Sequence, residues 1–430
     1  MLVSTTNTFG GVEVDSESDG EDQDKDRALH PSPQQPQISA TSSSSSQTLL
    51  PSSPSPHLLA FSQQHLSPSR PGIHPFISSL KSYLSPIDPI PYFTDLVEIA
   101  EGESGSVYAA RVSASAMPEI RSAGEREIQA GTSHVAIKRI ILPSSPTLDP
   151  ASTSTDDSPL VSKVSSLLHE LTLLKGIEHE HLLLLDAVYA TSNDADTAGQ
   201  ASTAVDSSLW IRMELMERSL ADVIGLVSEG LALQERMVGR FASDVLLGLE
   251  YLQKQHVAHR DVRSDNLLLN AGGIVKIADF SNAIRVTRNA PMVTGAVGVM
   301  YWQAPEMRAG PYNALKVDVW SLGATVWELA ETVPPFSMPA SPSTHTTFAL
   351  ARHPGSQWPP LSHPEHYSKA FHEFLRHCGR DPNGRPGPAE LLNTPLIRNA
   401  CGRAVILQLL SQCRSIEESM IARENSDRDS

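Results

Sequence analysis

Residues 259–266 read His-Arg-Asp-Val-Arg-Ser-Asp-Asn, and thirteen positions after Asn266 the sequence Asp-Phe-Ser begins, at 279–281. The first stretch follows a long amphipathic segment and the second follows the strand-like sequence Ile-Val-Lys-Ile-Ala, so both are predicted to be short loops. Phosphoryl transfer needs one carboxylate to orient a hydroxyl and oxygen ligands to hold Mg²⁺ against the phosphates. The spacing therefore predicts Asp261 in the first role and Asn266 and Asp279 in the second.

Two earlier segments carry groups that suit phosphate binding. Gly102 and Gly105 lie in a turn between two predicted strands, where glycines let backbone N–H groups approach a phosphate, although a plain hairpin turn explains the same residues. Further on, Val-Ala-Ile-Lys places Lys138 on a predicted buried strand, where an ammonium group should be paired. Glu170, on the helix that follows, is the predicted partner, and an ordinary charge at a strand edge is the alternative for Lys138.

The composition of the chain changes near residue 90. Residues 1–89 are acidic and then Ser/Pro-rich, so they are predicted to be a disordered tail, either purely solvating or carrying phosphorylation sites. Residues 90–398 have strand patterns first and helical patterns afterwards, which predicts an α+β domain. Residues 399–430 are expected to begin as an apolar helix and to fray into a charged tail. Three Ser/Thr/Ala/Asp-rich loop insertions interrupt the domain, near 113–133, 143–162 and 191–207.

The overall charge excludes some classes of partner. The 430 residues carry 33 Lys and Arg against 49 Asp and Glu, a formal charge of -16. This balance argues against nucleic acid or an anionic membrane as the main partner. No stretch approaches about 18 uninterrupted apolar residues, so no membrane span is predicted. The cysteines are scattered and the N-terminus lacks a signal-peptide pattern, which predicts a cytoplasmic protein, with access to the nucleus left open.

Three further motifs extend the pattern of the two loops. Ala-Pro-Glu ends at Glu306, Asp318 opens Asp-Val-Trp-Ser-Leu-Gly, and Arg385 lies in Asp-Pro-Asn-Gly-Arg-Pro. With these motifs, residues 91–398 resemble a eukaryotic protein kinase of the sterile-20 group, PAK-type Ser/Thr branch. The resemblance implies a two-lobed α+β kinase fold, with a small β-rich N-lobe and a larger helical C-lobe. It also implies an ion pair between Glu306 and Arg385 and a role for Asp318 in steadying the catalytic loop.

The resemblance also implies a complete site that uses ATP and Mg²⁺. Asp261 would be the catalytic base, and Lys138, held by Glu170, would contact the α- and β-phosphates. Arg260 would bind an activation loop phosphorylated at Thr294. The site so implied comprises the catalytic residues Asp261, Arg263, Lys138 and Glu170; the nucleotide contacts Gly102, Gly105, Val107, Ala136, Lys138, Met213, Glu214 and Met216, the last two at the hinge that reads adenine; the metal ligands Asn266 and Asp279; and the regulatory residues Arg260 and Thr294.

Four positions depart from the kinase pattern. Ala100 replaces the first glycine of the phosphate loop, and Arg263 replaces the catalytic-loop lysine. Ser281 replaces the glycine after Asp-Phe, at a predicted cost of ~1 kcal/mol if its backbone angle requires glycine. Val299 stands where Ser/Thr kinases present a threonine hydroxyl to the catalytic aspartate. None of the four removes the base, the metal ligands or the phosphate lysine. This favours an active kinase over a pseudokinase that serves as a scaffold or an allosteric binding module.

The implied partners are protein substrates and an upstream activator. The sequence Ser-Asp-Asn at 264–266 and the segment ending in Ala-Pro-Glu favour Ser/Thr over Tyr as the phosphate acceptor. Asp222 and Asp265 are predicted to form an acidic rim that prefers basic residues before the target hydroxyl, with a merely solvated surface as the alternative. A small GTPase is a further expected partner, although residues 1–89 contain no recognisable GTPase-binding motif.

Overall fold

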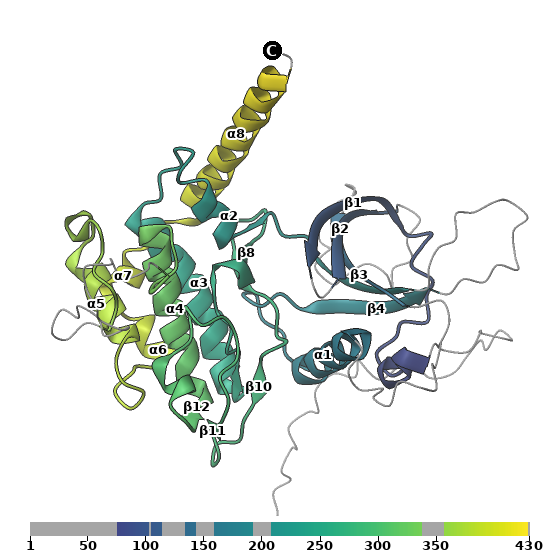
Figure 1. Ribbon diagram of the computed structural model, residues 1–430, viewed down its shortest axis with the longest axis horizontal. Coiled ribbons are helices and arrows are strands. Elements are labelled where there is room, and N and C mark those ends of the chain that lie inside the picture. The colour runs from purple at the N-terminus through teal and green to yellow at the C-terminus, as the bar shows by residue number, and fades with distance from the viewer. Residues whose placement is uncertain are drawn as a thin grey trace, which may run out of the picture. The chain divides into compact units, whose positions relative to one another are not determined.

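The computed structural model describes residues 75–102, 105–113, 134–142, 159–191, 208–337 and 357–428 (Figure 1). These residues all belong to one compact unit, Ser69–Ser430. Residues 1–74 of the predicted tail lie outside the described residues, as do most residues of the three predicted insertions.

The first part of the unit is an antiparallel sheet of five strands in the order β1-β2-β3-β5-β4. Side chains alternate between its faces, so β3, β4 and β5 each contribute to two apolar clusters, one on either face. Ile137 and Trp210 pack on one face with Phe93, while Ile140 and Ile211 pack on the other against helix α1. The elements are β1 Phe93–Gly102, β2 Gly105–Val112, β3 His134–Ile141, α1 Pro159–Leu174, β4 Leu185–Thr191 and β5 Ser208–Glu214.

The second part is mostly helical and contains the largest apolar cluster. Its central helix α4, Ala314–Glu331, begins at Asn313, whose side chain accepts a hydrogen bond from the Leu315 N–H, and it is buried along most of its length. The other helices are α2 Leu220–Gly225, α3 Glu235–Lys254, α5 Lys369–Cys378, α6 Pro388–Leu391, α7 Pro395–Arg398 and α8 Arg403–Arg428. Short strands line the loops between them: β6 Arg218–Ser219, β7 Val257–Ala258, β8 Leu267–Leu269, β9 Val275–Ile277, β10 Ile284–Arg285, β11 Met292–Val293 and β12 Tyr312–Asn313. The predicted α+β fold, with a sheet followed by a helical part, is confirmed.

Two predicted boundaries are wrong. The tail was predicted to be disordered through residue 89, but Pro75–Leu80 form a 3-10 helix whose Ile77 and Leu80 are buried against α1. The backbone N–H of Ser85 also donates to Val188 O of β4 at 2.7 Å. The apolar residues of this short stretch stand among Ser and Pro residues, and the sequence prediction gave more weight to that composition than to the apolar residues. The second insertion was predicted to end at 162, yet α1 begins at Pro159.

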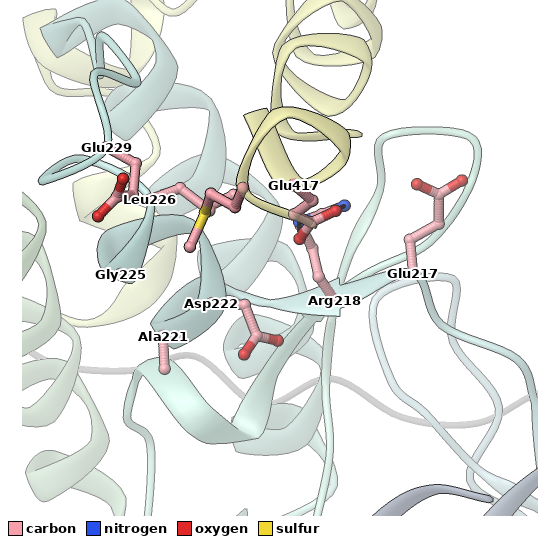
Figure 2. A pocket seen from close by; sticks show the side chains of 9 residues that line it. Glu217, Arg218, Ala221, Asp222, Gly225, Leu226, Glu229 and Glu417 are labelled. Carbon is pink, nitrogen blue, oxygen red and sulfur yellow. Dashed lines mark hydrogen bonds and ion pairs between the residues drawn. The ribbon is translucent and has the colours of Figure 1, made fainter. Parts of the chain in front are cut away.

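The C-terminal helix also differs from its predicted fraying. α8 remains helical to Arg428 and extends past the other helices (Figure 1). Two ion pairs join it to the segment before α2: Arg218 Nη1 to Glu417 Oε1 at 2.7 Å and Arg414 Nη1 to Glu217 Oε2 at 2.8 Å. Between α2 and α8 lies a cavity of about 550 Å³, with Arg218 and Glu417 at one side of it (Figure 2). Across the described residues, no helix is long and apolar enough to cross a membrane.

The two ion pairs of α8 differ in burial, so they give a matched test of how burial affects the contribution of an ion pair to stability. We expect Glu417→Ala to lower the free energy of unfolding by about 1.5–3 kcal/mol, because it leaves the 7 % exposed Arg218 side chain without its carboxylate. Arg414→Ala breaks the exposed pair and should cost no more than about 1 kcal/mol. Urea denaturation of the three proteins measures both values. Equal losses in the two variants would contradict the importance of burial at Arg218.

Candidate active site

The buried carboxylate of Asp318 holds the backbone of the loop at 259–266. Asp318 Oδ2 accepts the His259 backbone N–H at 2.8 Å and Asp318 Oδ1 accepts that of Arg260 at 2.7 Å. Burial raises the pKa of Asp318, while His259 and Arg260 act in the opposite direction. Arg260 itself has a positive φ of 66°. These two hydrogen bonds hold the strained turn that presents Asp261, as the kinase resemblance implied for Asp318.

The carboxylate of Asp261 is surrounded by amide donors. Asn266 Nδ2 donates to the Asp261 carbonyl oxygen at 2.8 Å and to Oδ2 at 3.3 Å, and Asn282 Nδ2 donates to Oδ2 at 3.3 Å. On the other side, the Val299 N–H donates to Oδ1 at 3.4 Å. Gly298 has φ +79°, and a Cβ there would lie 2.7 Å from Asp261 Oδ1. Only glycine therefore lets the chain pass this close to the carboxylate.

The second loop joins the first beside Asp261. The Ala278 N–H donates to Asn266 O at 2.8 Å, and the rings of His259 and Phe280 meet edge to face at 4.9 Å. Asp279 is exposed, with φ 63°, and its Oδ1 accepts the Ser281 N–H at 3.2 Å. Within the described part of the chain, Asn266 Oδ1 and Asp279 Oδ2 accept no hydrogen bond. These two free oxygens are the ligand type that Mg²⁺ prefers.

The predicted cost at Ser281 does not arise. Ser281 is absent from the residues with positive φ, and the left-handed conformation falls on Asp279 instead. A serine is therefore tolerated at this position without backbone strain. Ala100 is likewise accommodated, because it pairs with Val107 in the ladder between β1 and β2.

The predicted ion pair between Lys138 and Glu170 is not formed in the described residues, where the Lys138 ammonium makes no salt bridge with the Glu170 carboxylate. Glu170 is nevertheless close enough for Lys138 to affect it. Burial raises the pKa of Glu170, and the negative charge of Asp279 raises it further, while Lys138 lowers it. The helix therefore brings Glu170 near both Lys138 and Asp279, but the order of strand and helix could not predict its contacts.

The residues expected to contact nucleotide share neighbouring strands. Val107 is paired with Lys138, and Ala136 is paired with Met213. Gly105 has φ +131°, and a Cβ there would clash with Arg139 O, so this turn requires glycine. Gly102 faces Gly105 across the same turn, whose two intervening residues lie outside the described ones.

At the predicted hinge, one side chain is already occupied. Glu214 accepts Asn270 Nδ2 at 2.8 Å and pairs with Lys276 at 2.6 Å, so its carboxylate faces the helical part of the unit. Its backbone groups remain the ones that could read a base, followed by the half-buried Met216. Sequence reasoning did not single out Ile99 of β1, a large apolar residue that is 50 % exposed and lies three positions before Gly102. Its signal was an apolar residue directly before Ala100.

The comparison with known proteins decides the family. A model of the protein kinase domain matches residues 131–397. The chain belongs to the protein kinase family. Similar curated proteins include the serine/threonine-protein kinase pakB of Dictyostelium discoideum, 32 % identical over 51 % of this chain and 25 % of that protein. Others are the kinase shk1/pak1 of Schizosaccharomyces pombe, 28 % identical over 78 % of this chain and 43 % of that protein, and the kinase STE20 of Candida glabrata, 31 % identical over 74 % and 29 %.

These relatives confirm the predicted resemblance to PAK-type and sterile-20 kinases. The chain spans less than half the length of each of these three relatives. Their likeness therefore concerns the kinase domain.

Among the described residues of this kinase domain, Arg263 forms no hydrogen bond or ion pair with Asp261. Its guanidinium lies 3.1 Å from Asp265 Oδ2 and stacks over the Trp302 ring at 5.3 Å. The predicted catalytic position is thus occupied by an arginine whose charge is directed to a neighbouring acid and an aromatic face. Arginine favours such planar stacking, whereas a lysine would present a compact ammonium.

A buried acid that sequence reasoning missed supports this region. Glu328 of α4 is only 5 % exposed; its Oε1 accepts Ser264 Oγ–H at 2.8 Å and its Oε2 accepts Trp302 Nε1–H at 2.9 Å. Burial raises the pKa of Glu328 to about 7, and the negative charge of Asp265 adds to this. Its signal was an acid inside an apolar helical pattern. Glu328 thus links the catalytic loop of the kinase to the segment before Ala-Pro-Glu.

Glu328 should make the stability of the kinase domain depend on pH. Its raised pKa means that its stabilising contribution is fully present below about pH 4.5 and is lost as the pH rises through about 7. Glu328→Gln keeps a donor and an acceptor but cannot ionise. We expect the variant to gain up to about 3 kcal/mol over wild type between pH 5 and 8, measured by urea unfolding. If the difference in unfolding free energy between Glu328→Gln and wild type stays constant across this range, the raised pKa of Glu328 is contradicted.

The residues predicted to be regulatory, Arg260 and Thr294, lie on adjoining segments of the domain. Arg260 donates from Nε to Asn282 O at 2.8 Å and from Nη1 to Tyr312 Oη at 3.4 Å, and it forms no salt bridge with any described carboxylate. Tyr312 Oη–H in turn donates to Gly295 O at 3.1 Å. Thr294 is exposed beside Gly295. Tyr312 therefore connects the Arg260 guanidinium to the backbone of Gly295, the residue that follows the predicted phosphate acceptor Thr294.

The predicted ion pair between Glu306 and Arg385 is confirmed. Arg385 Nη1 lies 2.5 Å from Glu306 Oε1, and Nη2 lies 3.2 Å from Oε2. The arginine side chain is 1 % exposed, donates to Lys316 O at 2.8 Å and stacks over the Trp320 ring at 5.3 Å. This bidentate pair ties the Ala-Pro-Glu segment to the helices near the end of the kinase domain.

Proposed function

We propose that the chain is an ATP- and Mg²⁺-dependent protein kinase that transfers the γ-phosphoryl group of ATP to serine and threonine hydroxyls of proteins. The observation that carries the proposal is the meeting of Asp261, Asn266 and Asp279 on two hydrogen-bonded loops. The names of the relatives, all serine/threonine-protein kinases, favour the same reaction.

The residues of the site would have two kinds of role, binding Mg²⁺-ATP and accepting the proton of the substrate hydroxyl. Asn266 and Asp279 would hold Mg²⁺, which neutralises charge on the phosphates during transfer. Lys138 would bind the α- and β-phosphates, and Glu170 would influence it through charge, without a salt bridge among the described residues. Asp261 would orient the substrate hydroxyl and accept its proton, since the amides around it leave the carboxylate without a cationic partner among the described residues.

The nucleotide would lie against the strand face that carries Lys138. Val107, Ala136 and Met213 border that face by their strand pairing, and Gly102 and Gly105 would admit the phosphates. The backbone of Glu214 and Met216 would read adenine.

The alternative function is a pseudokinase that serves as a scaffold. Ala100 and Ser281 occupy backbone conformations that suit them, which removes two of the four reasons to expect it. Arg263 and Val299 remain as departures at the catalytic loop. Neither one is a metal ligand or the proposed base, so the kinase reading is favoured.

Substrate preference and regulation follow from charge. Asp222 and Asp265 would favour basic residues near the target hydroxyl, although Asp222 also accepts the Ser219 N–H and Asp265 is paired with Arg263. Thr294, when phosphorylated, would place its phosphate near Arg260. We also propose an upstream activator, a small GTPase being one class, and a cytoplasmic location, which suits three free, buried cysteines.

One labelling experiment tests the reaction class. Purified chain is incubated with γ-labelled ATP in Mg²⁺ or in EDTA, and the labelled protein is hydrolysed to its phosphoamino acids. We expect phosphoserine and phosphothreonine, formed only with Mg²⁺, and mass spectrometry should locate one phosphate at Thr294. Label on tyrosine alone, or equal label in EDTA, would contradict the proposed function; an unlabelled Thr294 would remove only its regulatory role.

A further inference from the structure

The loop after Asp279 contains a residue that touches both functional members of the catalytic turn. Asn282 Nδ2 donates to Asp261 Oδ2 at 3.3 Å, while Asn282 O accepts the Nε–H of Arg260 at 2.8 Å. Its side chain is half-buried, and neighbouring Ala283 is fully buried, so the loop holds Asn282 in place. No kinase motif in the sequence singled out this asparagine.

Val299, which lies beside Asp261 Oδ1, offers that carboxylate no side-chain hydrogen bond. Val299 has no hydroxyl, its side chain is 37 % exposed, and only its backbone N–H reaches Asp261 Oδ1, at 3.4 Å. Asn266 is the remaining side-chain donor, and its amide is shared between Asp261 O and Oδ2. A carboxylate that must point at a substrate hydroxyl needs fixed donors to hold its rotamer.

We propose that Asn282 is a positioning residue that orients the Asp261 carboxylate and supplies the side-chain donor that Val299 lacks. The inference rests on the proposed kinase function. A neutral amide suits the role because it holds the carboxylate by a hydrogen bond without adding a positive charge that would make the carboxylate a weaker base. Through its carbonyl, the same residue holds Arg260, so the turn is fixed at two points.

Kinetics separate this role from a merely structural one. We expect Asn282→Ala to lower kcat about 10-fold, with the KM for ATP and the melting temperature unchanged, because the lost bond positions the base and does not bind nucleotide. Asn393→Ala is the matched control: it removes an amide that donates to Ala389 O at 3.0 Å on a distant helix, and kcat should not change. An Asn282→Ala enzyme with wild-type kcat would overturn the proposal.

A second substitution tests the replacement of one donor by another. Val299→Thr adds a hydroxyl near Asp261 and should raise kcat more in the Asn282→Ala background than in wild type. Equal effects in both backgrounds would contradict the exchange of donors.

A spectroscopic measurement reads the hydrogen bond without turnover. The ¹⁵N-labelled side-chain amide of Asn282, assigned by its absence in Asn282→Ala, should change its proton resonance when Asp261→Ala removes the acceptor. An unchanged resonance would overturn the proposal even if wild type is active. Wild-type transfer no faster than that of Asp261→Ala would instead overturn the proposed function, and the resonance would still decide the contact.

Discussion

Asp261→Ala is expected to lower kcat for phosphoryl transfer by a factor of about 10²–10⁴, the usual contribution of a positioned general base. The carboxylate lies between Asn266, Asn282 and the Val299 N–H, with no cation paired to it among the described residues. Because the proposed phosphate lysine and the proposed metal-ligand oxygens are untouched, the affinity for Mg²⁺-ATP should remain that of wild type. Stopped-flow or quench-flow transfer to a serine peptide, with ATP binding measured by calorimetry, separates the two effects.

The control for this prediction is another acid of the same domain. Glu373→Ala removes a carboxylate whose ion-pair partner among the described residues is the exposed Lys369 on α5, and it should leave kcat unchanged. If Asp261→Ala instead weakened ATP binding and spared kcat, Asp261 would not be the base.

Glu306→Ala should have the largest effect on stability, about 3–5 kcal/mol in the free energy of unfolding. The substitution leaves the guanidinium of Arg385, 1 % exposed, without its bidentate partner. A whole domain of ordinary stability has only about 5–15 kcal/mol, so the variant should unfold at a much lower denaturant concentration. Guanidinium chloride titrations followed by circular dichroism measure the loss.

The same half-buried acid, Glu373, serves as the control for stability. Glu373→Ala should change the unfolding free energy by no more than about 0.5 kcal/mol. A loss below about 1 kcal/mol in Glu306→Ala would mean that water or Lys316 O compensates the buried charge, and the structural role of the pair would be wrong.

Local motifs explain why the loops could be predicted from the sequence. Asp261, Asn266 and Asp279 lie within a few tens of residues of one another, and the strand before Asp279 forces the two loops to meet. The alternation of β3 likewise placed Lys138 on a defined face of the sheet. In each case a short stretch of backbone determines where the side chain goes.

Contacts between distant segments could not be read in this way. Glu328 lies 64 residues from its partner Ser264, and Arg218 lies 199 residues from Glu417. The Lys138–Glu170 pair was predicted from the order of strand and helix, but its distance depends on where α1 packs. Asn282 had no signal at all, because an amide in a loop matches many roles until its neighbours are known.

The most direct test of the central claim is the ratio of single-turnover rates for wild type and Asp261→Ala, with saturating Mg²⁺-ATP and a basic peptide that contains serine. A working kinase predicts a wild-type rate at least about 100 times that of the variant. Equal, slow rates in the two proteins would contradict the account and identify the fold as a pseudokinase.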